Sequence, residues 1–299
     1  MPYLTPDRTY DLNGVTVHEK IIPDGTVWKN DEKAKKAGFG GAGALFKANI
    51  KLSGGTGRVQ GITVHNTNKL NISSKTTQAE QYTRATFNEN MSSARVHFFI
   101  CDSCAWQNLA LDEVSWHAGD GTNGQGNNTT LSLELIMDAE RDEYSEKTKE
   151  NGARIIAALM HTNGLGLDKM YTHTYFINKS LCRTGDLEYQ NTFRDSRARK
   201  YCPLYLLPQW EEFKALVQKH LDLLKGKGRR KGDVNGDGVI DSKDYLLVRR
   251  IVLGTYKPTP EELWAADLDG KGKVTAANYL KIKRHILGTY TIPEEYLVK

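Results

Sequence analysis

The stretch Gly61-Ile62-Thr63-Val64-His65-Asn66-Thr67 combines β-branched residues with a single imidazole. Side chains alternate along a strand, so Ile62 and Val64 share one face while Thr63 and His65 share the other. The stretch therefore predicts a strand that presents His65 away from its apolar side. A lone histidine on a strand is more often a packing residue than a metal ligand, so a functional site here requires other residues to join it.

Strands and helices alternate downstream of this stretch. A short strand or turn at 170–174 carries His173. The alternation predicts an α/β fold, with a mixed central sheet flanked by helices on both faces. Apolar runs predict strands at 94–100 and 131–137, and amphipathic runs predict helices at 76–87, 144–163 and 208–224.

Composition divides the chain into four parts. Residues 1–57 are irregular and are expected to form an N-terminal extension packed on the main domain, which covers 58–224. Residues 225–232 form a basic linker interrupted by glycines. A second, smaller domain is expected at 233–299.

The whole chain has 299 residues and a net charge of +5, from 41 basic and 36 acidic residues. This mixed surface does not predict nucleic-acid binding, and no apolar run approaches the roughly 20 residues of a membrane span. The four cysteines are too few for a disulfide scaffold. The opening Met1-Pro2-Tyr3-Leu4-Thr5 lacks the pattern of a secretory leader, which is expected to be absent from this sequence.

Residues 233–256 and 267–290 repeat each other at an offset of 34 residues. In the first copy, oxygen donors occupy positions 1, 3, 5, 9 and 12 of an EF-hand-type loop, with Gly238 at position 6, where the loop turns sharply. Hard oxygen ligands at this spacing favour calcium. The predicted calcium ligands, including the backbone carbonyl at position 7, are Asp233, Asn235, Asp237, Val239, Asp241 and Asp244.

The second copy of the loop departs from this pattern. Asp267 and Asp269 keep positions 1 and 3, but Lys271 stands at position 5 and Asn278 at position 12. A cation therefore occupies a ligand position. We expect one calcium ion in the first loop, and weak or no calcium binding by the second, where the lysine amine substitutes for the ion.

The tandem from Gly232 to Tyr290 closely resembles a type I dockerin, the module that docks secreted enzymes onto cohesin domains of a cellulosome scaffold. The resemblance implies a small all-α, calcium-binding domain and a cohesin partner. It also implies that the partner contacts come from loop positions 10 and 11 and from the helix that follows each loop. The matching residues are Ser242, Lys243, Arg249, Arg250, Lys283 and Arg284.

Five stretches of the main domain stand in an order and wording that resemble zinc-dependent N-acetylmuramoyl-L-alanine amidases of the phage-lysozyme and peptidoglycan-recognition group. The resemblance runs from about Gly61 to Val217 and implies that residues 58–224 form an amidase catalytic domain. It further implies one zinc ion bound by His65, His173 and Cys202. The five stretches are 63–67, 115–121, 133–135, His173 and Lys200-Tyr201-Cys202-Pro203.

The third zinc ligand has two candidates. His173 and Cys202 are 29 positions apart, which is farther than the family usually places its late histidine and its cysteine. Either the intervening segment is an insertion, or Cys182 is the ligand. Cys202 is preferred because Lys200 and Pro203 flank it as the motif requires.

The implied donor set makes chemical sense. Two imidazoles and one thiolate leave a fourth tetrahedral position for water, as in catalytic zinc sites. Glu134 is the candidate general base, because a carboxylate within an apolar strand is costly to bury without a role. Lys200 is the candidate for stabilising the oxyanion. The motif at 115–121 implies substrate binding by Trp116, His117 and Asp120.

Two further motifs carry less. Cys101 and Cys104 form a C-x-x-C pair without a second pair or a thioredoxin-like context, so structural thiols or a local disulfide are favoured over redox chemistry. The run 38–43 matches a dinucleotide-binding pattern, but a charged helical segment precedes it where a buried strand is required, so a flexible glycine loop is predicted.

Together these features predict a monomeric, extracellular amidase that cleaves the bond between N-acetylmuramic acid and L-alanine in peptidoglycan, attached to a cellulosome or the cell surface. A non-catalytic peptidoglycan-binding module is the alternative. A third possibility is the same fold turned to another amide.

Overall fold

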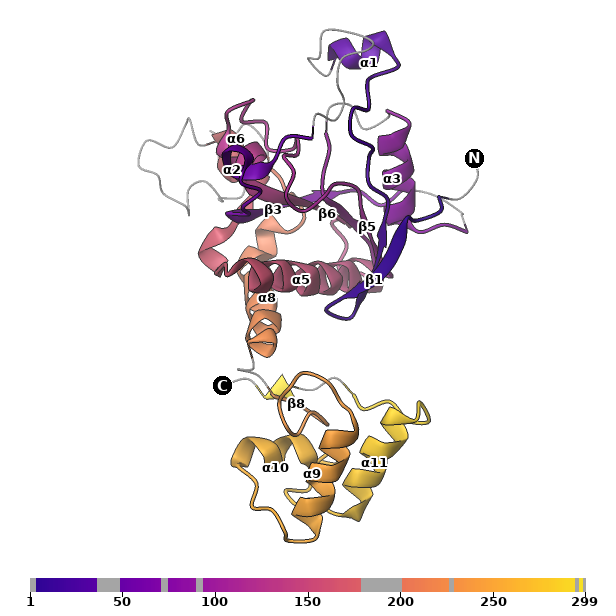
Figure 1. Cartoon of the computed structure of the whole chain (residues 1–299), viewed down its shortest axis with the longest axis vertical. Coiled ribbons are helices and arrows are strands. Elements are labelled where there is room, and N and C mark those ends of the chain that lie inside the picture. The colour runs from indigo at the N-terminus through magenta and orange to yellow at the C-terminus, as the bar shows by residue number, and fades with distance from the viewer. Residues whose placement is uncertain are drawn as a thin grey trace. The chain divides into compact units, whose positions relative to one another are not determined.

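The computed structural model describes residues 4–36, 49–70, 75–89, 94–178, 201–225, 229–293 and 296–297. The chain forms two compact units, Met1–Val217 and Gln218–Lys299, whose boundary falls within one helix, α8 (Trp210–Leu224). Each unit is described by itself (Figure 1).

The described part of the first unit is built on a seven-stranded sheet in the order β1-β2-β5-β4-β6-β3-β7. Strands β4, β6, β3 and β7 run parallel, while β1 with β2 and β4 with β5 are antiparallel pairs. The sheet is therefore mixed, as predicted. The strands are β1 (Arg8–Leu12), β2 (Val15–Glu19), β3 (Gly61–Thr67), β4 (Phe98–Ile100), β5 (Ala105–Gln107), β6 (Thr130–Ile136) and β7 (Met170–Thr172).

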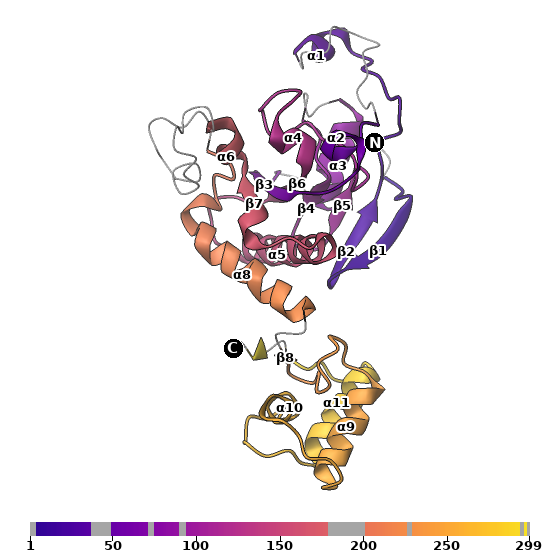
Figure 2. The ribbon, with the colours of Figure 1, turned by 60° about the vertical axis from the view of Figure 1, so that its left-hand side comes forward.

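Helices cover both faces of this sheet, which confirms the predicted fold class (Figure 2). Helix α5 (Glu143–Asn163) packs on one face so closely that a Cβ at Gly152 would lie 2.6 Å from a methyl of Leu135. Helix α3 (Gln78–Phe87) packs on the other face, where Tyr82 stacks on Phe99. Shorter elements complete the unit: α1 (Asp31–Lys36), α2 (Leu52–Gly55), α4 (Gln125–Thr129), η1 (Leu167–Lys169), α6 (His173–Asn178) and η2 (Leu207–Gln209).

Helix α5 begins and ends where local chemistry dictates. The Asp142 carboxylate accepts a hydrogen bond from the Ser145 N–H, which would otherwise lack a partner inside the helix. Gly164 ends the helix in the left-handed conformation at φ 64°, which glycine adopts without steric cost. The predicted end of this helix is thus confirmed.

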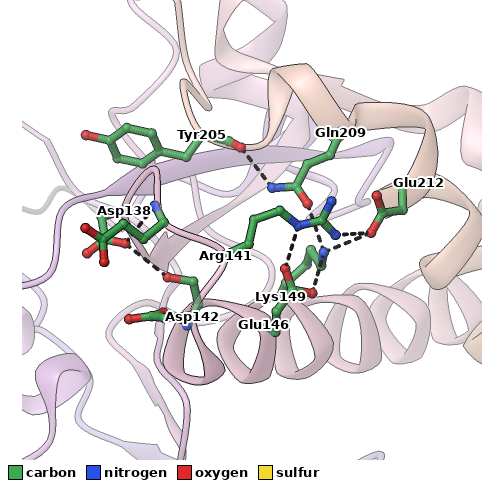
Figure 3. Close-up of polar contacts among 10 residues, drawn as sticks. Asp138, Arg141, Asp142, Glu146, Lys149, Tyr205, Gln209 and Glu212 are labelled. Atoms are coloured by element: carbon green, nitrogen blue, oxygen red, sulfur yellow. Dashed lines mark hydrogen bonds and ion pairs between the residues drawn. The ribbon is translucent and has the colours of Figure 1, made fainter.

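The start of α8 is held against α5 by a network of ion pairs (Figure 3). The side chain of Lys149 is only 4% exposed. Its ammonium group contacts the Glu212 carboxylate at 3.1 Å and the side-chain oxygen of Gln209 at 2.8 Å. Arg141 contacts the same Glu212 carboxylate at 2.6 Å. The Gln209 amide donates to the carbonyl of Tyr205 at 3.1 Å, so the network also secures the segment that follows residue 202.

The second unit contains two copies of a loop followed by a helix. Asp241 and Asp244 form a capping box at the start of α9 (Ser242–Val252), and Thr275 and Asn278 form the equivalent box at α11 (Ala276–Ile286). Helix α10 (Pro260–Ala266) lies between them in sequence, and a short antiparallel pair joins β8 (Arg229–Arg230) to β9 (Tyr296–Leu297). The buried core of the unit comprises Val234, Val248, Ala265, Ala266, Ile282 and Ile292.

None of the helices in the described ranges combines the length and apolar character that crossing a membrane requires.

Candidate metal centre

Three buried side chains from distant parts of the sequence converge in the first unit. His65 lies near the end of β3, His173 is the first residue of α6, and Cys202 follows much later in the chain. One nitrogen or sulfur atom from each lies within 4.8 Å of the others. The Nδ1 atom of His65 is 3.6 Å from the Cys202 sulfur. Two imidazoles and a thiol are ligands that soft and borderline transition metals prefer.

The register of the sheet explains why the two histidines meet. Strand β3 runs parallel to β7 with Val64 opposite Thr172, so the residues that follow them, His65 and His173, lie at the same edge of the sheet. This edge is the carboxyl end of the parallel strands, where open α/β sheets place their ligand sites.

The same register brings Glu134 beside the metal centre. Strand β3 also pairs in parallel with β6, and His65 is directly opposite Glu134. Residues paired in this way project from the same face of a sheet, so the half-buried carboxyl group and the imidazole are neighbours.

Cys202 is held in place by backbone contacts to the strand and helix that carry the histidines. Its N–H donates to the Thr174 hydroxyl at 2.9 Å, and the Thr174 N–H donates to the Cys202 carbonyl at 3.0 Å. Thr174 is the residue after His173. Three residues after Cys202, the Tyr205 N–H donates to the side-chain carbonyl of Asn66 at 3.0 Å. The geometry of the three donors is therefore set by short polar contacts, although 28 positions separate Thr174 from Cys202.

His117 determines which nitrogen of His65 is free to bind a metal. The Nε2 atom of His117 lies 3.1 Å from the Gly126 carbonyl, which can only accept, so Nε2 carries the proton. Burial, followed by the electrostatic effect of His173, holds the pKa of His117 well below its ordinary value, so the ring is neutral and its Nδ1 accepts. His65 Nε2 is 2.9 Å from that Nδ1 and must donate to it. The lone pair of His65 is therefore on Nδ1, the atom that faces Cys202.

The loop between 118 and 127 supports His117. The Asp120 carboxylate accepts hydrogen bonds from the N–H groups of Gly126 at 2.6 Å and Asn127 at 3.4 Å. The Asn127 side-chain carbonyl in turn accepts the N–H groups of His117 at 2.9 Å and Ala118 at 2.8 Å. This geometry favours positioning roles for His117 and Asp120 over the substrate contacts that the motif predicts, because their polar atoms are engaged within the protein. Sequence reasoning missed this role because the contact to His65 forms only in the folded chain.

The roles of the other residues predicted for this site are not tested by the structure. Trp116 is half-buried, and its predicted contact with substrate stays a prediction. Lys200 and Cys182 lie outside the described residues, as does the glycine run 38–43, so their roles stay predictions as well.

A comparison with protein families identifies the chain. The family model described as "N-acetylmuramoyl-L-alanine amidase" matches residues 55–204, which is half of the chain. The chain belongs to this amidase family. A second model, described as "Dockerin type I domain", matches residues 231–287, so a dockerin domain follows the amidase domain.

Curated relatives of the amidase domain carry the same description. The chain is 34% identical over 153 residues to the N-acetylmuramoyl-L-alanine amidase CwlH of Bacillus subtilis, a match that covers 49% of this chain and 58% of CwlH. It is 27% identical over 135 residues to XlyB of the same organism, covering 44% of this chain and 36% of XlyB. The chain therefore spans less than two thirds of the length of these relatives.

Solved structures similar to the amidase domain include a mutant endolysin from Bacillus subtilis. That match has 25% sequence identity and a TM-score of 0.43, and it covers 68% of this chain and 99% of the endolysin. The Staphylococcus aureus hydrolase AmiA matches with 18% identity and a TM-score of 0.44, over 76% of this chain and 98% of AmiA.

The donor set of the amidase domain fits zinc. Typical bond lengths of about 2.0 Å to nitrogen and 2.3 Å to sulfur, at a tetrahedral angle, place the two ligand atoms about 3.5 Å apart. The His65 Nδ1 and Cys202 Sγ atoms are 3.6 Å apart. The two atoms thus stand at the separation that a shared zinc ion requires.

The first loop of the dockerin domain offers oxygen atoms and a buried negative charge. The Asp233 carboxylate accepts the N–H groups of Gly236 at 2.8 Å and Gly238 at 3.0 Å, which shapes the turn. Asp244, at position 12, is fully buried, and this burial raises its pKa. A carboxylate in such surroundings is stabilised by a nearby cation, so the loop fits calcium.

In the second loop, protein donors contact the carboxylate of Asp269. The Lys271 ammonium group lies 3.3 Å from one oxygen of Asp269, and the Asn278 amide N–H₂ donates to the other oxygen at 3.3 Å. The Asn278 carbonyl oxygen accepts the Thr275 N–H at 2.7 Å. The two departures from the calcium pattern therefore contact the same acidic residue.

The predicted partner-binding residues are at the surface of the dockerin domain. Leu246 and Leu280 are also exposed, at 52% and 48%, and occupy equivalent positions in the two repeats. The sequence prediction did not include these leucines, although an alignment of the two repeats places them at the same position. The residues predicted to contact a partner, all exposed, are Ser242, Lys243, Arg249, Arg250, Lys283 and Arg284.

Proposed function

We propose that the chain is a zinc hydrolase that cleaves the amide bond between N-acetylmuramic acid and L-alanine in peptidoglycan, and that its dockerin domain attaches it to a cohesin outside the cell. The observation that carries the proposal is the convergence of His65, His173 and Cys202 within 4.8 Å, with Glu134 opposite His65 in the sheet. The family match supports the choice of substrate.

The residues divide the reaction between them. Zinc held by the three donors supplies Lewis acidity at the scissile amide. Glu134 takes a proton from the attacking water and returns it to the nitrogen of L-alanine as the carbon–nitrogen bond breaks. The products are the free lactyl carboxylate of the muramic acid and the free amine of the peptide. Lys200 is proposed to stabilise the negative oxygen of the tetrahedral intermediate.

The function is tested by product analysis on purified peptidoglycan. The zinc-loaded full chain is expected to release peptides with a new amino-terminal alanine, detected by mass spectrometry. Removing the metal with a chelator should stop the release, and added zinc should restore it. Binding to peptidoglycan without release would favour the non-catalytic module, and zinc binding without either would point to a different amide.

Changing His117 tests its proposed positioning role through zinc affinity. In His117→Gln the amide keeps a donor near the Gly126 carbonyl but loses the acceptor for His65, so zinc affinity is expected to fall about 10–100-fold. In His117→Asn the amide oxygen can replace Nδ1 as the acceptor, so the loss should be smaller. Competition with a fluorescent chelator measures both constants.

The informative result for His117 is which of the two variants binds zinc more tightly. Circular dichroism is needed to show that both retain the fold. Zinc affinities equal to that of the unchanged chain in both variants would remove His117 from the support of the metal centre.

Calcium titration tests the inequality of the two dockerin loops. We expect one tightly bound calcium ion per chain, because the second loop has Lys271 and Asn278 where the first loop has the carboxylates of Asp237 and Asp244. The double change Lys271→Asp and Asn278→Asp restores the ligand pattern and is expected to raise the stoichiometry to two. Isothermal titration calorimetry of the full chain gives the count.

A matched control separates ligand geometry from charge. Lys273→Asp adds a negative charge to the same loop at position 7, which contributes only its backbone carbonyl to calcium. This variant should still bind one calcium ion. Two tight sites of equal affinity in the unchanged chain would refute the proposal.

A further inference from the structure

The C-x-x-C pair, Cys101 and Cys104, lies at the turn between β4 and β5. The two cysteines flank this turn, and the Cys101 N–H donates to the Cys104 carbonyl at 2.9 Å. The two sulfur atoms are 3.7 Å apart. Both side chains are buried in the cluster beneath α3, at 0% and 4% exposure. The amidase chemistry proposed above uses neither thiol.

The backbone geometry of the pair suits a covalent bond. Facing residues of an antiparallel ladder that share a hydrogen bond have Cα atoms about 5.5 Å apart, within the range that disulfides span. The sulfur atoms lie on the same side of the hairpin and need to approach by about 1.7 Å to reach the S–S bond length of about 2.0 Å. We expect rotation about the two side chains to supply this approach without a shift of the sheet.

Both helices that cover the sheet brace this turn. From α5, the Asn151 amide donates to the carbonyls of Cys101 and Asp102, each at 2.9 Å. At the start of α3, the Thr77 hydroxyl accepts from the Cys104 thiol at 3.5 Å. The thiols are thus held facing each other in the folded chain.

We propose that Cys101 and Cys104 form an intramolecular disulfide when the folded chain meets a small-molecule disulfide. One cysteine thiolate attacks the small disulfide and displaces one thiolate from it. The second cysteine loses its proton and attacks the resulting mixed disulfide, which releases the second small thiolate. Two cysteine thiols are oxidised, and one small disulfide is reduced to two thiols.

The thiol pair favours Cys101 as the first nucleophile. The contact between the two sulfur atoms lowers the pKa of Cys101 and raises the pKa of Cys104. Because the thiolate is the reactive form, this difference assigns the attacking role to Cys101 and the resolving role to Cys104. The neighbouring Ser103 is exposed, so a small opening of the turn gives access to the pair.

Peptide mapping tests the modification. The zinc-loaded full chain is incubated under native conditions with excess oxidised glutathione, then alkylated, digested and analysed by mass spectrometry. The peptide that contains both cysteines is expected to lose two hydrogen atoms and to take up no alkylating agent. In Cys104→Ser the reaction should stop at a mixed disulfide of Cys101 with glutathione.

Controls separate this site from the other thiols. Zinc content should be equal before and after oxidation, because Cys202 belongs to a different site. The proposal is overturned if the native peptide retains two alkylatable thiols while the unfolded chain forms the disulfide under the same conditions. A disulfide from either cysteine to Cys202 or Cys182 would also overturn it.

Discussion

Replacing Glu134 by glutamine is expected to lower the rate of peptidoglycan cleavage by about 10²–10⁴-fold, which is the usual contribution of a general base. Glutamine keeps the size of the side chain but cannot accept a proton from water. Glu134 is directly opposite His65 in the sheet and is half-buried, so its carboxylate is proposed to face the reacting water. The three metal donors are unchanged, so zinc affinity should stay the same.

The measurement for Glu134 has two parts. Release of dye from labelled cell walls gives the rate, and elemental analysis gives the zinc content. Glu19→Gln, on strand β2 of the same sheet, is the matched control and should retain full activity. Equal release by the unchanged chain and Glu134→Gln would remove Glu134 from the mechanism. Loss of zinc together with activity would instead assign it a role in metal binding.

Replacing Cys202 by serine is expected to abolish cleavage through loss of the metal. A serine hydroxyl is not ionised at neutral pH, so the site loses its anionic ligand and one of three protein donors. Loss of a residue that supports a metal ligand lowers metal affinity about 10–100-fold. Loss of the ligand itself should lower zinc affinity by more than this. Competition with a fluorescent chelator measures the affinity, and the cell-wall assay measures the rate.

The matched control for Cys202 is Cys182→Ser, which changes the other candidate thiol. This variant should keep both zinc and activity. The reverse pattern, with zinc lost from Cys182→Ser and kept in Cys202→Ser, would assign the metal to Cys182. Unchanged zinc affinity in both variants would exclude a thiolate ligand altogether.

Local sequence determined several of the secondary structure elements and the type of each domain. The β-branched run at 61–67 predicts β3, and the glycine at 164 predicts the end of α5, because side-chain periodicity and backbone freedom act over a few residues. The spacing of oxygen donors from Asp233 to Asp244 likewise predicts a calcium loop, because a loop this short carries its ligands itself.

The tertiary structure decided how distant residues cooperate. The parallel register that puts His65 opposite Glu134, and the contacts between Thr174 and Cys202, depend on how the strands and loops pack. His117 shows the difference most clearly, because its motif predicts substrate binding while its hydrogen bond to His65 indicates support of the metal centre. A sequence specifies which groups are available over short distances, whereas hydrogen bonds between segments far apart in the chain exist only once the sheet has assembled.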